Sequence, residues 1–175
     1  MNGSFPNELR GPSPRRKVQN KMNNAPDFAN NLFLLMEETF ESKNHGIYLD
    51  EGTSLFETLE TVSAEEASIP VGGKCASLAA QVAHVTFFIE SFERFALQGD
   101  NSPRDWGLIW RTVQKVTPEQ WEEYKRKLKD ACLRMDKLFR ENPMWNQDSI
   151  GGALSIVVHT AYHLGEIRQA CCTLK

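Results

Sequence analysis

Residues 75–97, CASLAAQVAHVTFFIESFERFAL, decide the fold class of this chain. Apolar side chains recur here at helical spacing, at Leu78, Val82, Val85, Ile89 and Phe92. The remaining sides carry three more aromatic side chains, Phe87, Phe88 and Phe95. A helix that is apolar on most sides is typical of a buried element. The stretch therefore predicts a buried helix that ends at Gly99, where glycine is a common helix stop.

Three further segments have apolar side chains at the same period, at about 26–40, 118–142 and 148–172. The second opens with a capping box, because Thr117 can cap the helix, Pro118 suits its first position and Gln120 can reach back to the cap. Either Asp148 or Ser149 can cap the third. No convincing strand pattern lies between these segments. The four segments together predict an all-α fold, a four-helix bundle.

The connections between the predicted helices differ in character. The first long connection, 47–73, is rich in turn residues and holds one short helical piece around 55–67, interrupted by a capping-box pattern from Ser63 to Glu66. The second, 100–116, is expected to be a loop. The first connection is therefore long but has local structure.

Length and composition indicate one globular domain. The chain has 175 residues, of which 41% are hydrophobic and 25% are charged. Residues 1–24 have no hydrophobic periodicity and are expected to be a disordered N-terminal extension, so the bundle domain covers 25–175. The formal charge of -3 gives no broad attraction to nucleic acid or to anionic lipid, so neither is an expected partner.

The sequence also predicts a cellular compartment. No stretch approaches the roughly 20 apolar residues of a membrane-spanning helix, and the N-terminus lacks the charged-then-apolar order of a secretory signal. We therefore expect a cytoplasmic protein with no membrane partner. The four cysteines do not form a Cys-x-x-Cys pair and are expected to be free thiols.

Three histidines are the candidate site. His159 and His163 lie four residues apart on the last predicted helix, and this spacing brings two imidazoles within reach of one ion. His84 lies on the apolar helix, where a buried neutral imidazole needs partners for its nitrogens. Its face mixes small and polar side chains with an aromatic wall, as the lining of a pocket does. We hypothesise that the three bind one divalent metal ion, with a hydrogen-bonded core histidine as the alternative for His84.

The last helix can be interpreted in two ways. The side that carries both histidines also carries small or polar residues, Gly152, Ser155, Glu166 and Ala170. The opposite side carries apolar residues, Ile150, Leu154, Val157, Ala161 and Leu164. Either this apolar stripe is the core and the histidines face water, or the histidines line a pocket and the stripe packs on another helix or on a second subunit. Periodicity alone favours neither interpretation.

Two segments resemble the DinB/YfiT family of metalloenzymes: 77–84, SLAAQVAH, and 159–169, HTAYHLGEIRQ. The second is the more specific, and the order of the histidines along the helices also matches. Looser similarity runs through Leu55-Phe-Glu-Thr-Leu and the spacing of three tryptophans, Trp106, Trp110 and Trp121, so the resemblance covers about 25–175. Gln81 stands where relatives often carry a further histidine, which argues for three protein ligands rather than four.

The resemblance implies a bundle of up-down-down-up topology, usually dimeric, in which three histidines face one divalent ion such as zinc or nickel. His84, His159 and His163 fall on those positions. The family includes transferases and isomerases that use low-molecular-weight thiols, which implies a small-molecule substrate and a thiol co-substrate. We therefore expect an S-transferase or a metal-dependent hydrolase. A non-catalytic dimeric bundle with a structural or absent metal is the alternative.

Two polar neighbours of the histidines are candidate catalytic residues. Glu166, one turn beyond His163, can orient a ligand or accept a proton from bound water. Gln81, one turn from His84, can hydrogen-bond a molecule at the open metal position. Their structural alternatives are a solvated carboxylate and an amide that only fills space.

Four other residues are not assigned to the site. Arg168 points away from the histidines, so a structural or interface ion pair is expected there. Tyr162 and Trp110 can wall a pocket, but large aromatic side chains in a bundle are more often core residues. His45, at the end of the first helix, is expected to interact with the helix C-terminus.

Overall fold

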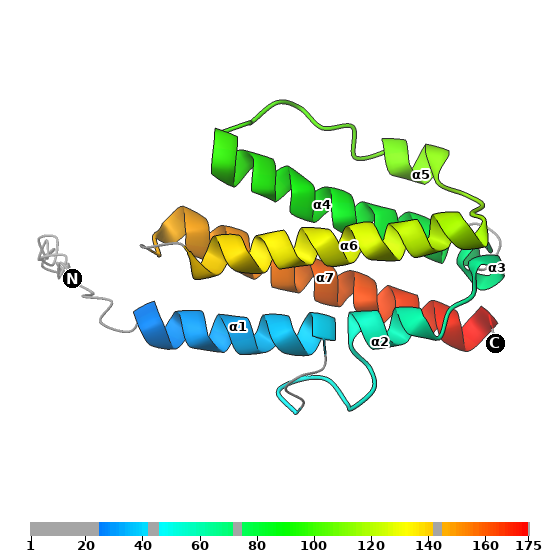
Figure 1. The fold of residues 1–175 in the computed structure, drawn as a ribbon, viewed down its shortest axis with the longest axis horizontal. Helices are drawn as coiled ribbons and strands as arrows, with labels where there is room; N and C mark the ends of the chain where they lie inside the picture. Colours follow the sequence, from blue (N-terminus) through cyan, green and yellow to red (C-terminus); the bar gives the residue numbers. More distant parts are fainter. Residues whose placement is uncertain (1–24, 42–45, 72–74, 142–144, 175) are drawn as a thin grey trace, which may run out of the picture.

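The computed structural model describes residues 25–41, 46–71, 75–141 and 145–174, and every regular element within these ranges is a helix. The long helices are α1 (Ala25–Glu41), α4 (Leu78–Gln98), α6 (Pro118–Arg140) and α7 (Gln147–Leu174) (Figure 1). The short helices are α2 (Leu55–Glu60), α3 (Ala64–Ala67) and α5 (Leu108–Thr112). The all-α prediction is confirmed for the described part of the chain.

Helix α4 is central to the packing, because it contacts α3, α5, α6 and α7. Four side chains of its predicted apolar stripe are buried, Leu78, Val82, Val85 and Ile89, and Phe92 is partly buried. The helix begins three residues later than predicted, since the Ser77 side chain accepts a hydrogen bond from the Ala80 N–H and caps it. It ends at Gly99 as predicted, and the φ of 65° at this residue lies in the left-handed region that favours glycine.

Helix α6 begins with the predicted capping box, in which the side chains of Thr117 and Gln120 each accept the other's backbone N–H. Trp121 fixes this end of the helix, because its ring is buried and its Nε1 donates to the Val62 carbonyl oxygen at 2.8 Å. The predicted stripe of α6 continues the core with three more buried side chains, Leu128, Ala131 and Met135.

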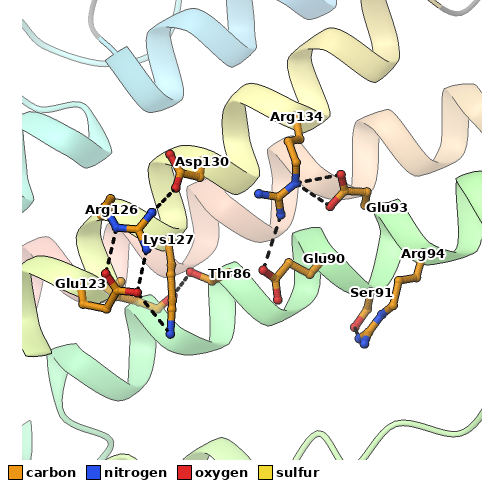
Figure 2. A network of polar contacts seen from close by, with 11 residues as sticks. Thr86, Glu90, Ser91, Glu93, Arg94, Glu123, Arg126, Lys127, Asp130 and Arg134 are labelled. Carbon is orange, nitrogen blue, oxygen red and sulfur yellow. Dashed lines mark hydrogen bonds and ion pairs between the residues drawn. The ribbon is translucent and has the colours of Figure 1, made fainter.

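Charged side chains line the surface where α6 passes α4 (Figure 2). Within α6, Arg126 pairs with Glu123 at 2.7 Å. Between the helices, Arg134 reaches Glu93 of α4 at 2.9 Å and Glu90 at 3.5 Å. Each such exposed pair contributes less than about 1 kcal/mol. Burial of the apolar stripes, rather than these ion pairs, therefore holds α4 and α6 together.

The cap of helix α7 differs from the prediction. Asn146 caps the helix, because its Oδ1 accepts the Ser149 N–H at 2.9 Å while the Ser149 Oγ accepts the Asn146 N–H at 2.9 Å. The prediction that Asp148 or Ser149 caps the helix is wrong. Both residues lie inside the first turn of a helix that already begins at Gln147.

The two sides predicted for α7 are not its buried and exposed sides. Its buried stripe lies between them: Ala153, Ile156, Val157, Thr160, His163, Leu164, Ile167 and Ala170. His163 is only 6% exposed, whereas Leu154 of the predicted apolar stripe is 41% exposed. Close packing is the physical reason, since a Cβ at Gly152 would meet the Phe92 ring of α4 at 2.0 Å. The absence of a side chain at Gly152 therefore lets α7 pack closely against Phe92 of α4.

The connections contain more helix than predicted. The expected single piece around 55–67 is two helices, α2 and α3, and the second starts at Ser63 with the predicted capping box. The segment 100–116, expected to be a loop, contains α5, so the loop prediction is wrong for residues 108–112. Helix α5 has no buried residue of its own and packs on α4. Its formation depends on that contact, which hydrophobic periodicity does not report.

A buried carboxylate, Glu38, fixes the loop that follows α1. The side chain is 1% exposed and accepts four backbone N–H groups at 2.9–3.2 Å, those of Gly46, Ile47, Tyr48 and Leu49. Burial alone raises the pKa of Glu38, but these N–H groups outweigh it and lower the pKa below its ordinary value. The carboxylate is therefore ionised and stabilises the loop.

None of the described helices is long and apolar enough to cross a lipid bilayer. The sequence predictions for residues 1–24 and for His45 lie outside the described residues. Helix α6 ends at Arg140, shortly before the predicted end at 142.

Candidate metal centre

The three predicted histidines come together from two helices, His84 from α4 and the other two from α7. One nitrogen of each ring lies within 4.8 Å of the other two. Nε2 of His84 and Nε2 of His159 are 3.2 Å apart. Two nitrogens that bind one tetrahedral zinc ion at about 2.0–2.1 Å are separated by about 3.3 Å. The donor set therefore fits a divalent ion.

His163 is oriented by two oxygen atoms behind its ring. Its Nδ1 lies 2.5 Å from Oε1 of Gln81 and 2.9 Å from Oε2 of Glu166. Both oxygens accept the proton on Nδ1, which fixes the tautomer and leaves Nε2 as the free nitrogen of the ring. Gln81 and Glu166 thus make the contacts of positioning residues, and their catalytic role stays a prediction.

Aromatic rings orient the other two histidines. Phe88 stacks on His159 with 3.7 Å between the ring centroids and 9° between the planes. Trp110 lies over His84 with a centroid distance of 4.5 Å. Nδ1 of each of these two imidazoles is buried and has no hydrogen-bond partner among the described residues. Stacking, rather than hydrogen bonds at Nδ1, therefore directs their Nε2 atoms toward each other.

The site keeps its imidazoles neutral. Burial, reinforced by the neighbouring imidazole of His163, lowers the pKa of His84 and of His159 to about 4 each. Burial also lowers the pKa of His163, and Glu166 opposes that shift. Only the neutral imidazole has a lone pair for a metal ion, so all three rings are in the binding form at pH 7.

A pocket of about 460 Å³ opens beside His163. Its walls come from α7, from α5, from the start of α4 and from the chain before it: Cys75, Ala76, Gln81, Trp110, Tyr162, His163 and Glu166. A second pocket of about 470 Å³, where α4 and α6 end and α7 begins, has no histidine or cysteine among its described lining residues. The first pocket therefore gives a small molecule access to His163.

Sequence reasoning misplaced two aromatic residues of this pocket and missed one thiol. Trp110 and Tyr162 were expected in the core, but they are 37% and 62% exposed. The prediction is wrong because α5 lies outside the main packing and Tyr162 lies on the exposed side of α7. Cys75 is an exposed free thiol that lines the pocket. The position of Cys75 in the pocket depends on the path of the chain before α4, and the sequence has no hydrophobic periodicity there that predicts this path.

The remaining sequence-predicted side chains lie outside the pocket. Arg168 makes a structural contact as expected, although its Nη1 donates to the Thr53 carbonyl oxygen at 3.1 Å rather than to a carboxylate. The four cysteines are all free.

Comparison of the chain with protein-family models, with curated proteins and with solved structures gave no match.

Proposed function

We propose that the chain is a metal-dependent enzyme in which His84, His159 and His163 hold one divalent ion, zinc or nickel. One observation carries the proposal: two Nε2 atoms 3.2 Å apart and a third histidine within 4.8 Å, beside a pocket of about 460 Å³. Three protein ligands leave one coordination position open. An ion bound there supplies Lewis acidity, which lowers the pKa of a thiol or of water at that position.

The reaction that we favour is S-transfer with a low-molecular-weight thiol as co-substrate. This choice rests on the resemblance to the DinB/YfiT family, and metal-dependent hydrolysis is the second candidate because water can take the same position. In either reaction Gln81 and Glu166 hold the proton on Nδ1 of His163 and so direct Nε2 into the site. Glu166 also lines the pocket, and a role for it as acceptor of the proton that a thiol or water releases is part of the proposal.

The coordination of the ion distinguishes an enzyme from a non-catalytic bundle. We expect X-ray absorption of the zinc-loaded protein to show three nitrogen ligands and one exchangeable ligand from solvent. Four protein ligands would indicate a structural metal and contradict the proposal.

The reaction itself is tested with a series of small thiols and an aryl chloride. The thiolate sulfur forms the new C–S bond, chloride leaves and the thiol proton passes to solvent. We expect zinc-dependent thioether formation by the wild type. Equal rates for the wild type and His159→Ala would reject thiol transfer.

We also propose an up-down-down-up order of the long helices and a homodimer. In Figure 1, α1 and α7 run in one direction along the bundle and α4 and α6 run in the other, which supports this order. The homodimer is supported by two exposed apolar side chains on one side of α7, Leu154 and Val158. Between Asp148 and Glu166 this helix carries no Asp, Glu, Lys or Arg. An exposed apolar side without charge is typical of an interaction surface.

A further inference from the structure

We infer that the pocket beside His163 selects thiol substrates that carry a positively charged amine, which it holds between Glu166 and the rings of Trp110 and Tyr162. This inference rests on the proposed function, because the thiol end of the substrate occupies the open position at the ion. It adds the chemical class of the group at the other end of the substrate, a positively charged amine.

The charge of the pocket carries the first part of the inference. Among its described lining residues Glu166 is the one with a formal negative charge, and none is a lysine or an arginine. Two arginines close to these residues in the sequence have other partners: Arg111 pairs with Asp105 at 2.5 Å, and Arg168 donates to the Thr53 carbonyl oxygen. The Glu166 side chain is 37% exposed, so its carboxylate can still accept hydrogen bonds from a ligand. These residues favour a cationic group over an anionic one.

Two aromatic rings carry the second part. Trp110 and Tyr162 line the same pocket as Glu166, and both rings are exposed to solvent. Tyr162 lies one helical turn before Glu166 on α7 and lines the same pocket, so its ring lies on the same side of the helix as the charge. A carboxylate flanked by accessible aromatic faces attracts ammonium groups through ion pairing and cation–π contacts.

The position of Glu166 sets the length of the substrate. Its carboxylate touches Nδ1 of His163, and Nε2 of the same ring is the nitrogen left free for the ion. A substrate that joins an ammonium group at Glu166 to a sulfur at the ion must therefore reach past the edge of one imidazole ring. A chain of two or three carbons between sulfur and nitrogen fits this arrangement, as in small aminothiols.

The experiment uses protein loaded with Co²⁺, whose thiolate-to-metal absorption reports thiol binding directly. It is titrated with thiocholine and with 3,3-dimethylbutane-1-thiol, which has the same shape without the charge; each binds as its thiolate and releases one proton to solvent. The quaternary nitrogen cannot coordinate the ion. The readout is the ratio of the two affinities, compared between variants so that the different acidities of the thiols cancel.

We expect Glu166→Gln to reduce this ratio about fivefold, the effect of one partly exposed charge pair. Tyr162→Leu should reduce it about threefold through the lost aromatic face, and it provides a second test if Glu166→Gln binds Co²⁺ poorly. Glu90→Gln removes the same charge from the α6-facing side of α4 (Figure 2) and should leave the ratio unchanged.

A ratio that is the same in the wild type, Glu166→Gln and Tyr162→Leu would overturn the inference while leaving the metal site intact. A wild type that binds no Co²⁺ would instead contradict the proposed function, and with it this inference. The two failures are therefore distinguishable.

Discussion

His84, His159 and His163 are neutral because burial and mutual repulsion disfavour three imidazolium groups in one small volume. A cluster of this kind destabilises the folded chain unless something binds the lone pairs of the imidazole nitrogens, because these buried nitrogens lose their contacts with water. Nδ1 of His84 and Nδ1 of His159 have no partner among the described residues. At the scale of single residues, the cluster therefore has the chemistry of a ligand set rather than of a hydrogen-bonded core network.

The first prediction concerns the pH dependence of stability in the metal-free protein. The pKa of His84 and of His159 is about 4 in the folded chain and about 6.5 in the unfolded chain. The unfolded chain therefore binds more protons between these pH values, so the free energy of unfolding falls as the pH falls from about 6.5 toward 4. Each histidine contributes up to about 1.4 kcal/mol per pH unit within this window.

Urea unfolding at pH 7, 6 and 5 measures this slope. The control variant is His84→Gln, which removes one of the two groups and should have a shallower pH dependence, while the carboxylates titrate alike in both proteins. An identical slope in the two proteins would show that His84 is not held neutral by the fold.

At the scale of elements, the second prediction concerns the junction between α1 and the loop after it. Glu38→Gln replaces a carboxylate that accepts four backbone N–H groups with an amide that has a single acceptor oxygen. We expect a loss of about 2–4 kcal/mol in the free energy of unfolding, measured at pH 7, because buried N–H groups lose a charged partner. Because the pKa of Glu38 is lowered, its contribution is present above the ordinary carboxyl pKa and is lost as the pH falls below it.

Glu65→Gln is the matched control for this variant, since Glu65 is exposed on α3. It should change the free energy of unfolding by less than about 0.5 kcal/mol. If Glu38→Gln were equally mild, the carboxylate would not be what holds the loop.

The elements also show what sequence can predict. The four long helices were predictable, because the apolar period of α4 and the capping box of Thr117 are local signals. The cap of α7 was not, because Asn146, Asp148 and Ser149 are all competent caps and only the path of the preceding chain selects one. Helix α5 was missed because it is stabilised by its contact with α4 rather than by an apolar stripe of its own.

The candidate site, like the helices, was predictable only in part. Its three histidines were predictable, since two lie on one helical face and the third lies on the buried helix. Their surroundings were not, because Trp110 reaches the pocket through the packing of α5 and Cys75 through the path of the chain before α4. Tyr162 reaches it from the exposed side of α7. The buried side of α7 could not be chosen from periodicity, and it lies between the two sides that the sequence suggested. A helical wheel weighs residues by hydrophobicity, whereas the close approach of Gly152 to Phe92 sets the rotation of the helix.

At the scale of the whole molecule, the third prediction is that two copies associate through α7. The contact is expected at Leu154 and Val158, the exposed apolar side chains of α7 that do not line the pocket beside His163. A two-fold axis brings these side chains of both copies together. Val158→Glu should therefore convert a dimer into a monomer, measured by light scattering after size-exclusion chromatography, because it buries two unpaired carboxylates.

Leu133→Glu is the control for the dimer, since Leu133 is equally apolar and exposed but lies on α6. This variant should keep the mass of the wild type. A wild type that is monomeric at every concentration would contradict the association.

The measurement that tests the central claim most directly is the metal content of the purified protein after zinc loading and dialysis, determined by mass spectrometry of the digested sample. We predict about one zinc per chain for the wild type and for His45→Ala, which changes the remaining histidine, and none for His159→Ala or His163→Ala. Circular dichroism must show the same helix content in all four proteins. Zinc-free wild type, or histidine variants that keep their zinc with the fold unchanged, would contradict the three-histidine metal site.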